Sequence, residues 1–106
     1  MSTPTMNDIA APLTALRLLA TDFPTLPAAT VGVSTIFPNR LDLSFHDDFA
    51  AFEAWRSALG IDSDTVTYDE QSSGRTRVLT VWADYAGARL RLTGYTAHPD
   101  HIGGAE

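Results

Sequence analysis

The sequence predicts an α+β domain with a five-stranded, mainly antiparallel sheet, in the chain order α-β-β-α-β-β-β, with both helices on one face. Two apolar stripes with helical spacing alternate with segments in which apolar and polar residues alternate one by one. All strand connections except one are short enough for hairpins. Hairpins with one apolar face bury that face under helices and leave the other to solvent.

The first helix is expected from Pro12 to Asp22. Pro12 suits the first turn, where a missing N–H costs little, and Pro24 forces the end of the helix. Its apolar stripe consists of Leu13, Leu16, Leu19, Ala20 and Phe23. The segment PTLPA, residues 24–28, predicts an extended linker.

A hairpin and a second helix should follow the linker. Alternating apolar residues on either side of Pro38, Asn39 and Arg40 predict a strand, a turn and a strand: Val31, Val33, Phe37, Leu41, Leu43 and Phe45. The stripe of the second helix is Phe49, Phe52, Trp55 and Leu59. We expect Asp47 as its N-cap, Gly60 at its C-terminal end, and Ile61 folded back on its last turn.

The segment from Asp64 to Tyr95 predicts a three-stranded meander whose side chains sort in one register only. With Ser73 and Gly74 in the first loop, the predicted pairs are Tyr68 with Leu79, Val66 with Val81, Thr67 with Thr80 and Glu70 with Arg77. With an even-length loop around Tyr85, Ala86 and Gly87, the second hairpin pairs Ala83 with Leu90, Val81 with Leu92, Asp84 with Arg89 and Trp82 with Arg91. A three-residue loop with Gly87 in a left-handed conformation is the main competing arrangement.

The join between the first hairpin and the meander stays open at this level. The second helix can return the chain beside Phe45 or across the sheet, so the join can be parallel or antiparallel. The expected core is Leu13, Leu16, Leu19, Val33, Leu43, Phe45, Phe49, Phe52, Trp55, Leu59, Val66, Tyr68, Leu79, Val81, Leu90 and Leu92.

Composition indicates a single globular domain over residues 1–106, ordered from about residue 8 to residue 97 with loose ends. A hydrophobic fraction of 44% excludes a disordered chain, and the absence of cysteine excludes a disulfide-stapled domain and thiol catalysis. No apolar run approaches a membrane span, and no basic start resembles a signal peptide, so we expect a cytoplasmic protein. The net charge of −6 argues against direct nucleic-acid binding.

The polar face of the meander is the surface that the fold alone does not explain. An exposed Trp82 forgoes roughly 2 kcal/mol of burial, whereas Arg91 over its ring recovers only about 0.5–1 kcal/mol. Because Trp, Tyr and Arg are enriched at protein interfaces, we expect a non-enzymatic binding or dimerisation module. The predicted face consists of Thr65, Thr67, Asp69, Thr76, Val78, Thr80, Trp82, Asp84, Arg89, Arg91, Thr93 and Tyr95. In the competing interpretation, Arg91 merely covers an exposed Trp82 and the face binds nothing.

Two other functional hypotheses remain. A small-molecule binder or enzyme would use a pocket between sheet and helices near Tyr68, Glu70, Arg77 and Trp55. An acidic nucleic-acid mimic or inhibitor would need its carboxylates on one surface, namely Asp42, Asp47, Asp48, Asp62, Asp64 and Asp69.

Catalytic and metal chemistry have little support in the sequence. Asp69 and Glu70 are neighbours on a strand and point to opposite faces, so they cannot share a proton. His46, Asp47 and Asp48 are explained by helix capping. His98 and His101 flank Pro99 and Asp100 at a spacing compatible with a metal, but in a tail expected to lack supporting partners. We therefore predict no catalytic residue, no metal site and no cofactor.

Two stretches, FPNRLDLSFHDDFAAFEAWRSALGI and GRTRVLTVWADYAGARLRLTGY, are similar to short proteins of unknown function from Streptomyces and related actinobacteria. The similarity covers residues 12 to 96. It implies a bacterial cytoplasmic origin and assigns no activity or site residue.

Overall fold

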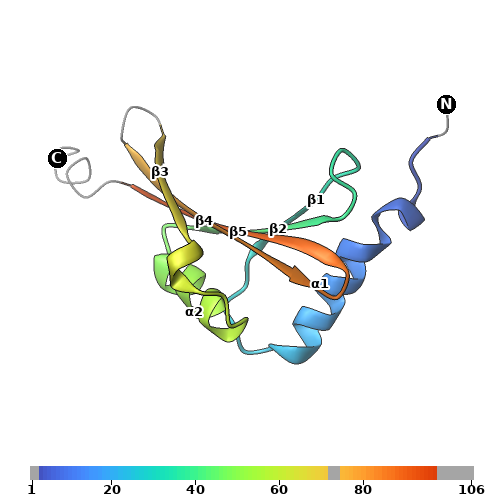
Figure 1. Ribbon diagram of the computed structural model, residues 1–106, viewed down its shortest axis with the longest axis horizontal. Helices are drawn as coiled ribbons and strands as arrows, with labels where there is room; N and C mark the ends of the chain where they lie inside the picture. Colours follow the sequence, from blue (N-terminus) through green and yellow to red (C-terminus); the bar gives the residue numbers. More distant parts are fainter. Residues whose placement is uncertain (1–2, 72–74, 98–106) are drawn as a thin grey trace.

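The computed structural model describes residues 3–71 and 75–97 and confirms the predicted α+β class and element order (Figure 1). The elements are η1 (Met6–Ile9), α1 (Ala10–Asp22), β1 (Thr30–Val33), β2 (Arg40–His46), α2 (Phe49–Ala58), η2 (Ser63–Thr65), β3 (Thr67–Gln71), β4 (Thr76–Tyr85) and β5 (Ala88–Ala97). None of the helices formed by these described residues has the length and apolarity to span a bilayer.

The sheet has the strand order β1-β2-β5-β4-β3, and this order settles how the first hairpin joins the meander. β2 and β5 run parallel, with Leu41 opposite Leu90 and Leu43 opposite Leu92. The other three strand pairs are antiparallel. The last strand of the chain, β5, is therefore the central strand of the sheet and lies between β2 and β4.

The predicted register of the meander is confirmed at both hairpins. Trp82 lies opposite Arg91 and Asp84 opposite Arg89, while Tyr68 lies opposite Leu79 and Glu70 opposite Arg77. Val66 lies one residue before β3, which begins at Thr67, so its expected pair with Val81 is not part of the strand ladder. Ser73 and Gly74 lie outside the described residues.

The β4–β5 turn has two residues, so the three-residue alternative is excluded. Tyr85 pairs with Ala88, and both Ala86 and Gly87 have positive φ, at 51° and 85°. Positive φ at both positions is typical of the type I′ turn, whose twist matches that of the flanking strands. The turn therefore fixes the even loop length on which the register depends.

The N-cap of α2 is Asp48 and not Asp47, which corrects the prediction. The Asp48 carboxylate accepts a hydrogen bond from the Ala51 N–H at 2.9 Å. Asp47 instead takes a left-handed φ of 59°, and its N–H donates to the Tyr95 carbonyl. The C-terminal end follows the prediction: Gly60 has a φ of 70°, and the N–H of the next residue, Ile61, bonds back to the Arg56 carbonyl at 3.1 Å.

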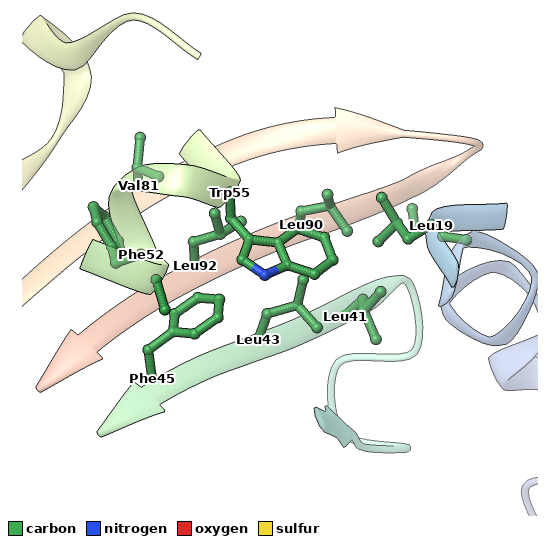
Figure 2. Packing of buried hydrophobic residues seen from close by; sticks show 12 residues of the cluster. Leu19, Leu41, Leu43, Phe45, Phe52, Trp55, Val81, Leu90 and Leu92 are labelled. Carbon is green, nitrogen blue, oxygen red and sulfur yellow. The ribbon is translucent and has the colours of Figure 1, made fainter. Parts of the chain in front are cut away.

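The core lies between the two helices and one face of the sheet (Figure 2). Phe45 packs edge-on to Phe52, with ring centroids 6.5 Å apart, and its centroid lies 6.3 Å from that of Trp55. The buried cluster comprises Ala15, Leu19, Leu41, Leu43, Phe45, Ala51, Phe52, Trp55, Val81, Ala88, Leu90 and Leu92.

Several predicted core residues lie at the margin of this cluster. The half-buried ones are Leu13, Leu16, Val33, Phe49, Leu59, Val66 and Leu79. Tyr68 was predicted in the core but is 53% exposed, because β3 is an edge strand and the helices pack on β2 and β5. Conversely Leu41, which was left out of the predicted core, is fully buried beside Leu90.

Gly94 on β5 provides the space in which α2 approaches the sheet. A Cβ at this position would lie 3.1 Å from the Phe49 ring and 3.3 Å from the Phe52 Cβ.

We expect Gly94→Val to lower the free energy of unfolding by about 1–3 kcal/mol through overpacking. The matched change Gly32→Val should cost much less, because the nearest atom to a Cβ there is 3.5 Å away. Urea unfolding measures both; equal losses would contradict this account of the helix–sheet contact.

The two aspartates before α2 should differ in their contribution to stability. Asp48→Ala should cost about 1 kcal/mol, since it removes the cap of the Ala51 N–H. Asp47→Gly should change stability by less than about 0.5 kcal/mol, because glycine accepts the positive φ at that position. Thermal unfolding of both variants measures the two losses of stability. A larger loss for Asp47→Gly than for Asp48→Ala would indicate that Asp47 is the N-cap.

Candidate binding face

The helices cover one face of the sheet, and no described element covers the other (Figure 1). We call this second side the open face. Alternation along the strands places on it Thr30, Gly32, Arg40, Asp42, Ser44, His46, Thr67, Asp69, Gln71, Thr76, Val78, Thr80, Trp82, Asp84, Arg89, Arg91, Thr93 and Tyr95. The predicted face is thereby placed on one side and extended by β1 and β2. Thr65 is the exception, because it belongs to η2 and not to a strand.

Trp82 lies on the open face beneath two guanidinium groups. The Cζ atoms of Arg89 and Arg91 lie 5.2 Å and 5.7 Å from the indole centroid, within the range of cation–π attraction. The side chain nevertheless keeps 40% of its surface exposed. Arg91 was the expected cover, and Arg89 is a second one that the sequence analysis missed.

Asp42 holds Arg91 in position from the neighbouring strand. Arg91 Nε donates to Asp42 Oδ1 at 2.8 Å, and Arg40 Nε lies 3.3 Å from the same oxygen without the geometry of a hydrogen bond. Only the parallel join puts Asp42 opposite Arg91. By contrast, Arg89 makes a long 3.4 Å contact with Asp84, and both of these side chains are well exposed.

A hollow of about 420 Å³ lies at one end of the open face, between Trp82 and the β1–β2 loop. The loop contributes Ile36, which is 79% exposed, and Phe37, which is 50% exposed. Arg40 Cζ lies 3.9 Å from the centroid of the Phe37 ring, and Arg89 completes the wall. From the sequence, Phe37 fits the alternating pattern of a strand. The apolar rim that Ile36 and Phe37 form around the hollow was therefore not predicted.

A row of hydroxyl side chains crosses the middle of the open face over all five strands. Neighbours in the sheet register connect Thr30, Ser44, Thr93, Thr80 and Thr67. These side chains are short and uncharged, so the centre of the face carries no charge. Thr80, predicted as a site residue, belongs to this row.

At the other end of the open face, His46 and Tyr95 stack with ring centroids 5.0 Å apart and planes at 9°. Val78 lies opposite Tyr95 and is only 6% exposed. Of the predicted residues at this end, Tyr95 therefore offers contact surface and Val78 offers little.

The open face is electrically balanced, although the chain is acidic. It carries three arginines, Arg40, Arg89 and Arg91, and three aspartates, Asp42, Asp69 and Asp84, so its formal charge is zero. The chain as a whole has a net charge of −6. The acidic excess therefore lies away from the open face.

The residues of the predicted pocket do not come together in one place. The Tyr68 hydroxyl donates to Glu70 Oε2 at 2.8 Å, and this bond raises the pKa of Tyr68 above its ordinary value. The Cζ atom of Arg77 lies 5.3 Å from the centroid of the Phe49 ring. Trp55 lies instead in the core, where its indole N–H donates to the Pro27 carbonyl at 2.7 Å. Tyr68, Glu70 and Arg77 form a small group on β3 and β4 without Trp55.

Within residues 3–71 and 75–97, no three histidine, aspartate or glutamate side chains gather as ligands for a metal ion. Asp48 caps a helix and His46 stacks on Tyr95, so neither side chain points to a common ion. His98, Pro99, Asp100 and His101 lie outside the described residues.

No family model matches the sequence, and no curated protein matches it.

The two ion pairs of the open face should differ in strength. A double-mutant cycle with Asp42→Ala and Arg91→Ala should give a coupling of about 0.5–1 kcal/mol, because the 2.8 Å contact is partly buried. The same cycle with Asp84→Ala and Arg89→Ala should give a coupling near zero, because that 3.4 Å contact is exposed. Urea unfolding of the six variants at low protein concentration measures both couplings. Equal couplings would contradict the view that Asp42 fixes Arg91 over Trp82.

Proposed function

We propose that this protein is a small non-enzymatic module that associates with a second copy of itself through the open face. A complete sheet face that is free of net charge and centred on an arginine-covered Trp82 is the observation that supports this proposal most. The proposal includes the cytoplasmic location and the actinobacterial kinship expected from the sequence.

The dimensions of the open face suit a stable interface. Five strands at about 4.8 Å spacing and some seven residues at about 3.4 Å each give a face of roughly 24 by 24 Å. The resulting projected area is on the order of 600 Å², and protruding side chains add to it. It approaches the ~800 Å² that each partner buries in a standard protein interface. Two such sheets would pack about 10 Å apart, as in a β-sandwich.

The charges on the open face favour another copy of the same face. In a two-fold arrangement each residue of one copy meets a residue of the other reciprocally. Asp84 and Arg89 hold each other weakly at 3.4 Å, so each can exchange its partner for the opposite charge on the second copy. Since the open face has no formal charge, two copies approach there with less repulsion than through the acidic remainder.

Trp82 provides the apolar anchor of the proposed interface. Full burial of the indole is worth roughly 2 kcal/mol more than leaving it exposed, and two exposed cation–π contacts recover only part of that. A second copy that covers Trp82, Ile36 and Phe37 would remove the exposed apolar surface at that end of the face.

The acidic-mimic hypothesis has less support. It requires free carboxylates in regular rows, but Asp42 binds arginine, Asp48 caps α2 and Asp62 caps η2. A different protein on the open face is the other alternative, and the test below separates it from self-association.

Sedimentation equilibrium of the wild type and of Trp82→Ala tests the proposal. We expect the wild type to form dimers at micromolar concentrations and Trp82→Ala to dissociate at least about tenfold more readily, since an anchor at an interface typically contributes more than 1 kcal/mol. Tyr68→Ala is the matched control, because it removes an exposed aromatic ring outside the open face. A wild type that stays monomeric at millimolar concentration would overturn self-association and leave a different partner.

A further inference from the structure

A second hollow lies on the helical side of the sheet, opposite the open face. It has a volume of about 300 Å³ and opens between α1, the linker after it and β1. Leu43 of β2 and Trp55 of α2 line it from inside the core, Leu16 and Leu19 line it from α1, and Phe23 lines it from the residue after α1. Figure 1 shows α1 and α2 resting apart on the sheet, with the linker crossing between them.

The side chains that line this cavity are all aliphatic or aromatic, and its surface is mostly apolar. Each of its twelve residues is Leu, Ala, Pro, Val, Phe or Trp, and no charged side chain is among them. The one polar side-chain atom, the indole N–H of Trp55, is already bonded to the Pro27 carbonyl. The cavity therefore offers dispersion contacts and no side-chain partner for a charged or strongly polar group.

The outer wall of the cavity is stiff, because Pro24 and Pro27 restrict the backbone of the linker. The bond from Trp55 to Pro27 ties that wall to α2, 28 residues further along the chain. Restricted linker backbone and a bond to α2 favour a site that is formed before a ligand binds, which lowers the cost of binding.

We propose that this cavity binds a small neutral molecule that is largely hydrocarbon, such as the chain of a fatty alcohol or ester. Ligand pockets begin at about 300 Å³, so the volume of this open and mostly apolar cavity suits one short chain. A carboxylate or phosphate group would remain outside, since no cation lines the cavity. The inference is independent of self-association, which uses the opposite face.

Titration with 1-octanol, followed by NMR of leucine and valine methyl groups and the Trp55 indole N–H, tests this site. We expect saturable shifts confined to residues around the cavity, such as Leu16, Leu19, Val31 and Leu43. The probe 1,8-octanediol has the same length with a hydroxyl at each end. It should bind at least about tenfold more weakly, because its second hydroxyl must enter a mostly apolar site that offers it no side-chain partner.

Two cavity-filling variants, Ala20→Phe and Ala29→Phe, should each weaken 1-octanol binding by at least about tenfold. Ala50→Phe is the matched control, because Ala50 is exposed on α2 and does not line the cavity; it should bind as the wild type does. Shifts that do not saturate, equal binding of the diol, or unchanged binding by both filled variants would each overturn the proposal.

Discussion

The parallel pairing of β2 with β5 is the constraint on which the rest of the structure depends. It places Leu41 and Leu43 beside Leu90 and Leu92, so the four most central side chains of the sheet are buried together. Both helices then pack over these two strands. The same pairing sets Asp42 against Arg91 on the other side of the sheet. One register therefore determines both the core and the arrangement of charge on the open face.

The two sides of the sheet carry different chemistry because side chains alternate along every strand. The covered side is apolar, and the cavity beside the linker lies where α1 and α2 stand apart. The open side holds paired charges, hydroxyl groups and an indole under two arginines, and Trp and Arg are residue types enriched at protein interfaces. The proposed self-association and the proposed hydrocarbon site thus use opposite sides of one sheet and can be tested separately.

Local pattern was sufficient to predict the helices, the meander and the side on which Trp82 lies. Alternation permits only one register at Trp82 and Arg91, and the two-residue turn maintains it. Long-range features were not predictable from the sequence. The ion pair of Asp42 with Arg91 depends on the parallel pairing of β2 with β5, which the connection through α2 does not determine by itself. The exposure of Tyr68 depends on the position of β3 at the edge of the sheet. Asp47 and Asp48 are equally good caps by residue type, and only the backbone turn distinguishes them.

The central claim is that the open face of one copy meets the open face of another. Isotope-filtered NOE spectra of a mixed sample, with one labelled and one unlabelled population, detect contacts between copies directly. We expect NOEs between copies from the Trp82 indole and from the Ile36 methyl groups of the adjoining loop to residues of the open face. NOEs between copies that arise only from α1 or α2, or none at concentrations where the protein sediments as a dimer, would contradict it.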